Sequence, residues 1–383
     1  MRCMGLFASS DCASTGHLAP GPELVQLLPS SSPLPPSPPL PSPPLPSPPL
    51  PSPPPLPSPS PPLEQSLDPP PQQQGVACPQ FSAVNFSGDG SADSAYTPSG
   101  ARKYLIIARV GGLGNQLFQV AAGVRMAVAT GRLPLLGQVL NNPHATVAYE
   151  ASVFRRMCEA PPLLAIEHSF GQDSDVFAYM PPPPPPPDVA VVSMAGFWQN
   201  WRYVDLPPRA LRALFAPPPD LIARLEREYG PLADCAAVHV RRGDYLENEN
   251  ARGIDEAYFE AALRRFQGAA GPLPSCLLVA SDDIAWAMKQ PCFVSRSARF
   301  VTQEDEVATF YLLAAAARGL ICPNSTFCWW AAFLGRDDDG VTKRFVALPK
   351  PWANDVATAP DSYYFPGVVT IDRRDWVHAG AGA

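Results

Sequence analysis

The chain has 383 residues, a formal net charge of −7 at pH 7 and 46% hydrophobic residues, which is enough apolar material for the cores of two domains. About half of its 52 prolines precede Gln72, mostly in a repeat from Ser30 to Pro62 that excludes helix and sheet and predicts an extended stalk or linker. The nine cysteines lack the close paired spacing of a zinc site, and no run of residues predicts a transmembrane helix. Some cysteines would form disulfides in an oxidising compartment, but we expect most of those in strand-like runs to be small core residues.

The first regular element of the folded part is a buried strand from Lys103 to Val110. A glycine-rich loop, GGLGNQ, follows at once, and then comes an apolar helix that closes at Gly131. A strand, glycine loop and helix in this order present backbone N–H groups and a positive helix end to an anion. A dinucleotide-binding fingerprint is excluded, because Leu117 replaces its third glycine and no carboxylate occurs between Asp93 and Glu150. A tight turn that only packs the helix on the strand remains the alternative.

The middle of the first half is harder to interpret. Residues 141–190 show no regular pattern, and the seven prolines from Pro181 to Pro187 predict a surface loop. A strand from Val189 to Ala195 then ends in an aromatic patch, which comprises Phe197, Trp198, Trp201 and Tyr203 and lies beside Gln199 and Asn200. Two interpretations have similar weight: a surface that faces a sugar, or an aromatic wedge buried at a domain interface.

After Asp234, strands and helices alternate regularly. We expect strands at 236–240, 276–280, 299–302, 320–322 and 345–348, and helices at 255–267, 284–289, 305–318 and 327–334. This alternation predicts a parallel, doubly wound sheet. The carboxyl-edge loops of such a sheet would gather many polar residues, namely Arg241, Arg242, Asp244, Asp282, Asp283, Gln303, Glu304, Asn324, Ser325 and Thr326.

Two adjacent arginines, Arg241 and Arg242, stand at the end of the 236–240 strand. Neighbouring guanidiniums repel each other unless an anion lies between them, and their planar forks suit the oxygens of a diphosphate. The alternative is a surface pair bound to Asp244 and Glu247. The position at a strand end, beside His239 and before a glycine turn, favours a phosphate site.

Five motifs, in this order and spacing, resemble those of the α-1,2-fucosyltransferases of glycosyltransferase family eleven. They are GGLGNQLFQ, GFWQNWRYV, HVRRGDYL, SDDIAWA and PNSTFCWWAAFLG. The resemblance covers about Lys103 to Trp352. Five ordered motifs are far more specific than any one of them.

The resemblance implies an α/β, GT-B-like fold with two facing Rossmann-like domains. We expect a disordered Pro/Ser-rich segment at 1–77, an acceptor-side Rossmann-like domain at 78–233, a nucleotide-sugar-binding domain at 234–352, and a tail at 353–383 that packs back or is partly disordered. The family also implies GDP-β-L-fucose as donor, a galactose-containing glycan as acceptor, inversion to an α-1,2 linkage, no metal cofactor, and a lumenal location in the Golgi. We expect no nucleic-acid partner.

The resemblance also assigns roles to residues. Arg241 is the main ligand of the departing diphosphate, because a reaction without a metal needs fixed positive charge there. The other expected substrate-binding residues are Arg242, His239, Gly112, Gly114, Asn115, Gln116, Asn324, Ser325, Thr326 and Asp282. Inversion by direct displacement needs a base. Asp244 is the first candidate, followed by Asp282, Asp283 and Glu304, and the alternative is that Asp244 orients Arg242.

The chain departs from the family pattern at two positions. Phe310 stands where the family usually has an acidic residue that pairs with guanine, and Gly319 replaces a common histidine. Glu306 or Asp305 is a candidate substitute for the carboxylate, or guanine selectivity is relaxed. The acidic run Asp337 to Asp339 predicts a solvated loop rather than a metal site. Two other functions stay open, a related transferase with another donor or acceptor and a non-catalytic glycan-binding wall protein.

Overall fold

The computed structural model describes residues 76–86, 103–140, 142, 145–172, 177–249, 251, 253–353 and 361–377. All of these residues belong to one compact unit that spans 71–383. The predicted proline-rich stalk at 1–77 lies outside the described residues except for its last two. No helix among the described residues is both long and apolar enough to cross a lipid bilayer.

The described residues form two sheets in which all paired strands are parallel. The first sheet has the order β3-β2-β1-β5-β4, with β1 Tyr104–Arg109, β2 Leu133–Val139, β3 Cys158–Glu159, β4 His168–Gly171 and β5 Val191–Ala195. The second has the order β11-β10-β9-β6-β7-β8, with β6 Cys235–Val240, β7 Cys276–Ser281, β8 Arg299–Val301, β9 Gly319–Ile321, β10 Phe345–Lys350 and β11 Val369–Asp372.

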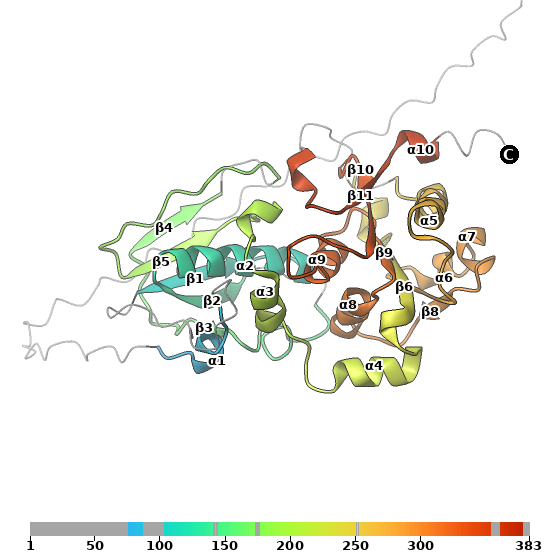
Figure 1. The fold of residues 1–383 in the computed structure, drawn as a ribbon. Coiled ribbons are helices and arrows are strands. Elements are labelled where there is room, and N and C mark those ends of the chain that lie inside the picture. The colour runs from blue at the N-terminus through green and yellow to red at the C-terminus, as the bar shows by residue number, and fades with distance from the viewer. Residues whose placement is uncertain are drawn as a thin grey trace, which may run out of the picture. The chain divides into compact units, whose positions relative to one another are not determined.

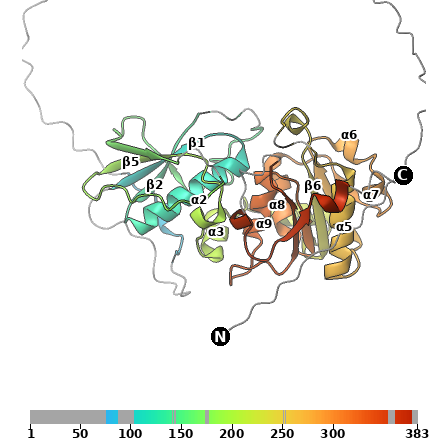
Figure 2. The same ribbon diagram turned by 90° about the horizontal axis from the view of Figure 1, so that it is seen from above.

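Helices connect the strands and cover the sheets. They are α1 Pro79–Ser82, α2 Leu113–Ala129, α3 Pro208–Leu214, α4 Leu221–Tyr229, α5 Glu256–Ala270, α6 Ile284–Ala287, α7 Pro291–Val294, α8 Glu306–Ala315, α9 Thr326–Leu334 and α10 Arg374–Val377. Figures 1 and 2 show α2 and α3 of the first half beside α8 and α9 of the second. The predicted α/β fold with two Rossmann-like halves is confirmed.

The strand order decides where each sheet can hold a ligand. Counted from β6, the second sheet has the order 3-2-1-4-5-6, which is that of the dinucleotide-binding fold. Ligands in such sheets bind outside the carboxyl ends of the strands, where the order reverses. That point lies between β6 and β9 in the second sheet and between β1 and β5 in the first. The loops after these four strands are therefore the expected walls of a site.

Some strands were not predictable from the sequence pattern. β2 contains Pro134 and Gly137, which normally argue against an interior strand. β11 lies in the predicted C-terminal tail, yet it pairs with β10 and extends the second sheet. β3 and β4 lie in the stretch without a regular pattern, and each pairs only a few residues at a sheet edge.

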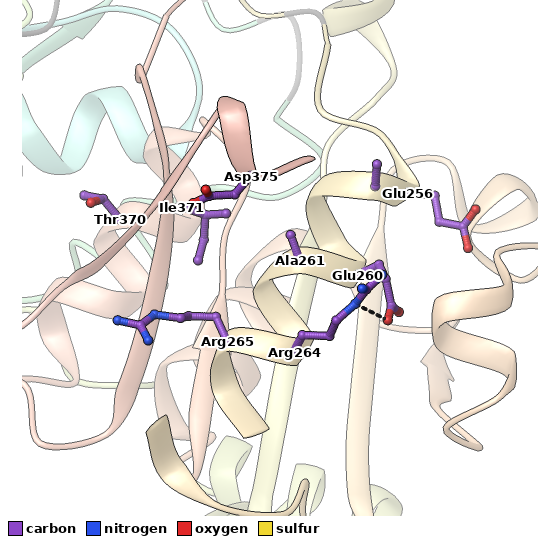
Figure 3. Close-up of a pocket in the computed structure, with 9 residues that line it drawn as sticks. Glu256, Glu260, Ala261, Arg264, Arg265, Thr370, Ile371 and Asp375 are labelled. Atoms are coloured by element: carbon purple, nitrogen blue, oxygen red, sulfur yellow. Dashed lines mark hydrogen bonds and ion pairs between the residues drawn. The ribbon is translucent and has the colours of Figure 1, made fainter. Parts of the chain in front are cut away.

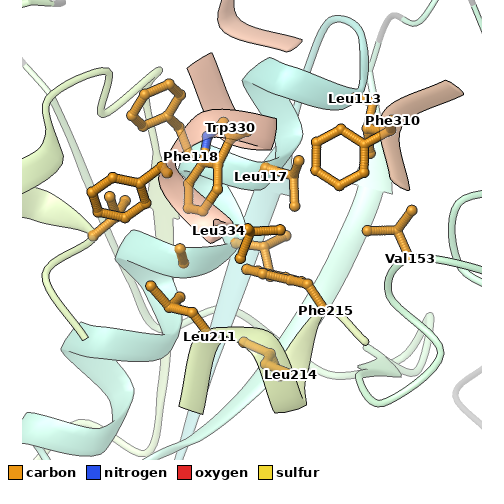
Figure 4. Packing of buried hydrophobic residues seen from close by; sticks show 14 of the residues in the cluster. Leu113, Leu117, Phe118, Val153, Leu211, Leu214, Phe215, Phe310, Trp330 and Leu334 are labelled. Carbon is orange, nitrogen blue, oxygen red and sulfur yellow. The ribbon is translucent and has the colours of Figure 1, made fainter. Parts of the chain in front are cut away.

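An aromatic and aliphatic core joins α2 to α9. Phe118 of α2 packs against Trp329 and Trp330 of α9, with ring centroids 4.4 and 5.2 Å apart. Figure 4 shows how Leu117 of α2 and Phe215, after α3, fill the space around Trp330. The two halves therefore share one continuous hydrophobic core, which fixes the positions of the two helix amino ends.

Three disulfides agree with the alternative that some cysteines pair, and they correct the expectation that most cysteines in strand-like runs are simple core residues. Cys78 bonds to Cys158, Cys235 bonds to Cys276, and Cys322 bonds to Cys328. Within the described residues, Cys292 is the free cysteine, and it is buried. The Cys322–Cys328 bridge closes the short loop between β9 and α9, so it holds the Asn-Ser-Thr segment in place.

The closest approach of α2 to α9 requires a glycine at position 114. A Cβ there would lie 2.4 Å from the backbone nitrogen of Phe327 and 2.5 Å from the carbonyl carbon of Thr326. We predict that Gly114→Ala lowers the free energy of unfolding by about 1–3 kcal/mol, because neither backbone segment can move aside cheaply. Replacing glycine by alanine inside a helix otherwise stabilises the helix. A loss of stability in this variant would therefore be caused by the clash.

The measurement is urea unfolding of the purified protein, with Gly112→Ala as the matched control. Gly112 has an ordinary φ of −69°, and no atom lies within 4 Å of its added Cβ. The control should cost less than about 1 kcal/mol, as expected at the start of a helix. Equal losses in the two variants would show that close packing at Gly114 is not the cause.

Candidate active site

A cavity of about 900 Å³ lies where the strand order of each sheet reverses. Its first-half wall includes Gly112, Gly114, Asn115, Phe177, Phe197 and Gln199. Its second-half wall includes His239, Arg241, Asp244, Tyr245, Asp282, Thr302, Glu304, Glu306, Thr309, Asn324, Ser325, Thr326 and Trp352. The four predicted loops, after β1, β5, β6 and β9, therefore line one cavity.

The amino ends of two helices lie on this cavity. α2 begins after Gly112 and α9 after Ser325, and neither of these N-cap residues caps its helix with its own side chain. Uncapped N–H groups together with the positive end of the helix dipole make an anion-binding site. Ser325 is almost fully buried, so its hydroxyl adds a further donor in a sheltered position.

The glycine loop and the Asn-Ser-Thr loop touch each other through Asn115. Asn115 Oδ1 accepts a hydrogen bond from Thr326 Oγ1 at 3.0 Å and another from Gln199 Nε2 at 2.9 Å. Three of the five sequence motifs thus meet at one amide oxygen. This contact places Asn115, Ser325 and Thr326 together, as the sequence predicted.

Arg241 supplies the positive charge of the cavity. The described residues that line it include two basic side chains, the guanidinium of Arg241 and the imidazole of His239. Its guanidinium contacts Asp244 at 2.6 Å through Nη2 and Asp282 at 3.2 Å through Nη1, and it lies over the ring of Tyr245. Two carboxylates therefore orient the guanidinium and leave it only one quarter exposed.

Arg242 lies outside the cavity wall, unlike its neighbour. Its guanidinium stacks on Trp286 with 4.0 Å to the ring centroid and contacts Asp283 at 3.3 Å. The strand alternation explains the difference. Ala236, Val238 and Val240 face the core beside α5, whereas Ala237 faces the core shared with the first half. Continuing this alternation sends Arg241 toward the cavity and Arg242 away from it.

His239 lines the cavity on the same face of β6 as Ala237. Burial, and then the nearby charge of Arg241, lower the pKa of His239 to about 3. The imidazole is therefore neutral at physiological pH and can donate through one nitrogen while accepting through the other. Its buried Nδ1 has no hydrogen-bond partner among the described residues.

Gln116 supports the glycine loop instead of lining the cavity. It is fully buried, its Nε2 donates to Gly111 O at 2.8 Å, and its Oε1 accepts from Arg109. Gln119, which sequence reasoning missed, holds the same loop by paired bonds with the backbone of Val110. Both amides fix the loop that begins α2.

The four candidate bases lie in different environments. Asp244 and Asp282 line the cavity beside Arg241. Asp283 caps α6 by accepting from Trp286 N and contacts Arg242, away from the cavity wall. Glu304 lines the wall but is bound by both terminal nitrogens of Arg224 at 3.0 and 2.6 Å. Asp244, with its side chain 46% exposed, is the most accessible of the four carboxylates, and it orients Arg241 rather than Arg242.

The three residues considered for reading the base lie in different environments. Phe310 is fully buried against Phe327, with ring centroids 5.5 Å apart, and cannot reach a ligand. Asp305 caps α8 by accepting from Ala308 N at 2.7 Å. Glu306 lines the cavity, where its Oε1 accepts from Thr146 N at 2.8 Å. Of the two proposed substitutes, Glu306 is the one on the wall.

The aromatic patch after β5 has residues in both predicted environments, the ligand-facing surface and the buried core. Phe197 lines the cavity, while Trp198 and Tyr203 are buried against each other with centroids 5.1 Å apart. Trp201 is half-buried and lies beside Arg202. Most of the patch is thus core, and one ring of it reaches the site.

Several wall residues were missed from the sequence. Tyr245 donates from its hydroxyl to Asn324 O at 3.3 Å and so ties the arginine loop to the Asn-Ser-Thr loop. Phe177 and Trp352 carry no local motif, and they reach the cavity from the irregular stretch and from the end of β10. For Tyr245 the signal was its place two residues after the glycine of HVRRGDY.

Other hollows differ in character from this cavity. A hollow of about 570 Å³ beside α5 and β11 is lined mostly by charged residues, among which Glu260 and Arg264 are in contact at 2.8 Å (Figure 3). Among the described residues, no group of three or more His, Cys, Asp or Glu could hold a metal ion. In the acidic run, Asp338 pairs with Arg212 and Asp339 with Lys343.

The model of glycosyl transferase family 11 matches residues 225–361, which contain the arginine and Asn-Ser-Thr loops. This match supports the resemblance to glycosyltransferase family 11. It covers the part of the second sheet whose carboxyl-end loops build the site. The comparisons support a transferase, as the resemblance implied.

Two relatives illustrate the family. An Escherichia coli alpha-1,2-colitosyltransferase is 28% identical over 282 residues, covering 65% of this chain and 92% of the relative. A Caenorhabditis elegans galactoside 2-alpha-L-fucosyltransferase is 26% identical over 164 residues, covering 39% of this chain and 44% of the relative.

Solved structures are more distant. The fucosyltransferase NodZ from Bradyrhizobium aligns with 17% identity and a TM-score of 0.41 over 61% of this chain and 93% of that one. An Arabidopsis thaliana FUT1 variant in complex with GDP aligns with 14% identity and a TM-score of 0.39 over 69% and 74%. Scores at this level add nothing to the geometry of the site described above.

Proposed function

We propose that this chain transfers L-fucose from GDP-β-L-fucose to a galactose-type hydroxyl, with inversion to an α-1,2 linkage and without a metal ion. The observation that carries the proposal is the convergence of Arg241 with the uncapped amino ends of α2 and α9 on one cavity. This arrangement suits a diphosphate, which needs compact positive charge and several N–H donors. The similarity to an alpha-1,2-colitosyltransferase and to a galactoside 2-alpha-L-fucosyltransferase supports an α-1,2 linkage and a galactoside acceptor.

The reaction follows from the same residues. The acceptor oxygen attacks the anomeric carbon of fucose while the bond from that carbon to the diphosphate oxygen breaks. Negative charge then grows on the leaving GDP, where Arg241 and the helix N–H groups stabilise it. Asp244 accepts the proton of the acceptor hydroxyl. Because Arg241 holds both Asp244 and Asp282, a bound diphosphate would compete for the guanidinium and release Asp244 for this task.

A donor other than GDP-fucose is the second candidate. It is favoured by the colitosyltransferase similarity, which extends over 92% of that relative. A comparison of donors at fixed acceptor concentration separates the two candidates. The larger kcat/KM identifies the donor sugar.

One prediction of the proposed function concerns Arg241. Replacing it by Lys or Ala should lower kcat by about 10²–10³-fold, because a point charge or no charge replaces a preorganised fork. The measurement is GDP release from GDP-fucose with lactose or N-acetyllactosamine, in the presence of EDTA. Arg265→Ala, at an exposed arginine of α5 outside this cavity, is the control and should keep full activity. Full activity of the Arg241 variants, or a requirement for Mn²⁺, would refute the proposal.

Another prediction of the proposed function concerns guanine. We expect Glu306 to accept hydrogen bonds from the base, because it is the carboxylate of α8 that faces the cavity. Calorimetry should show that the wild-type protein binds GDP more tightly than UDP. Glu306→Gln should reduce the GDP affinity by about tenfold and leave the UDP affinity unchanged, since hydrogen bonds to a charged group contribute about 1.5–3 kcal/mol.

The control is Glu228→Gln, which removes an exposed carboxylate paired with Arg299 at the surface. Its affinities for both nucleotides should match those of the wild type. Equal affinity of the wild-type protein for GDP and UDP would mean that no carboxylate reads the base.

A further inference from the structure

The strand order gives the cavity a direction. Along the second sheet the strands run β10-β9-β6-β7-β8, so Trp352, Arg241 and Thr302 follow one another along its carboxyl edge. Arg241 lies in the middle, with lining residues on both sides. Asp282 and Thr302 line the arm beside β7 and β8, and Trp352 lines the arm beside β10. The arm beside β7 and β8 carries Glu306 and other polar residues, which suits a nucleoside. The arm beside β10 has a different lining.

The β10 arm is aromatic. The ring of Trp352 lies 4.8 Å from that of Tyr363, and the ring of Phe177 lies 5.5 Å from the same tyrosine. Both cavity-lining rings are therefore at one end of the cavity. The segment after β5 contacts both this end and the corner where Asn115 meets Thr326. Gln199 Nε2 donates to Asn115, and Asn200 Nδ2 donates to Phe177 O at 2.7 Å.

The loop that carries Phe197 is held in an unusual backbone conformation. Gly196 has a φ of 129°, and Trp198 has a φ of 55°, a value that a bulky side chain rarely adopts. Trp198 is anchored, because its N–H donates to Gln172 Oε1 at 2.6 Å and its ring packs on Tyr203. Such conformations gather at ligand sites. Here the anchored neighbours leave Phe197 half-buried on the cavity wall.

We propose that Phe177 and Phe197 form the acceptor subsite and take the neutral pyranose ring of the accepting glycan. The apolar C–H face of the sugar packs on the rings, and the amide of Gln199 bonds a hydroxyl and positions it near the diphosphate corner. Among the described residues that line the cavity, the guanidinium belongs to Arg241, which lies between the two arms. No described lining residue of the β10 arm is therefore basic. The subsite therefore selects neutral acceptors over sulfated or carboxylated ones. This inference rests on the proposed function.

The test compares Phe197→Ala with Trp201→Ala, which removes a half-buried ring of the same segment that does not line the cavity. Phe197→Ala should raise the KM for lactose or N-acetyllactosamine on the order of tenfold, as expected for losing the contact of one aromatic side chain. Its affinity for GDP by calorimetry should equal that of the wild type. Phe197→Tyr, which keeps the ring, should restore the acceptor KM.

Trp201→Ala should leave the acceptor KM unchanged. Phe177→Leu is a second, independent variant that should also raise the acceptor KM without changing GDP binding. An unchanged acceptor KM in both phenylalanine variants, or a parallel loss of GDP affinity, would overturn the subsite. So would a preference of the wild type for sulfated over neutral galactosides. A wild-type protein that binds GDP but transfers no sugar to any galactoside would instead refute the proposed function.

Discussion

The close contact between the amino ends of α2 and α9 is the constraint on which the site depends. Gly114 permits the approach, and Asn115 joins the two ends by accepting from Thr326. The shared aromatic core behind them fixes both helices, and the Cys322–Cys328 bridge closes the loop in front of α9. Because neither N-cap residue caps its helix with its own side chain, N–H groups of both first turns can bind an anion between the helices.

Arg241 adds the full charge that partial helix charges cannot supply. Two carboxylates orient its guanidinium before a ligand arrives, and in the proposed reaction a bound diphosphate replaces Asp244 as its partner. The neighbouring Arg242 is stacked on Trp286 and paired with Asp283, which supports the loop from behind. Neutral His239, beside Arg241, can exchange hydrogen bonds with a ligand without adding charge repulsion.

Much of the second half was predictable from its sequence, because its strands are apolar runs separated by clear helices. The order of the motifs then placed Arg241 and Asn324 to Thr326 at one edge. That Arg241 faces the cavity and Arg242 does not follows from which face of β6 each residue lies on. The sequence does not determine these faces, because all residues of this strand before His239 are small and apolar. β2 was missed because of Pro134 and Gly137, and the wall residues Phe177 and Trp352 were missed because tertiary packing alone brings them to the cavity. Gln116 was predicted to bind substrate, but it is buried and donates to Gly111 O, so it supports the glycine loop.

The central claim is that fixed protein charge, rather than a cation, binds the diphosphate. Calorimetric titration of the wild-type protein with GDP and with GMP, both in EDTA, tests it most directly. The account predicts that GDP binds at least tenfold more tightly than GMP, since the second phosphate meets Arg241 and two helix ends, with about 1.5–3 kcal/mol for each charge-assisted bond. Equal affinities, or GDP binding that appears only when Mn²⁺ is added, would contradict it.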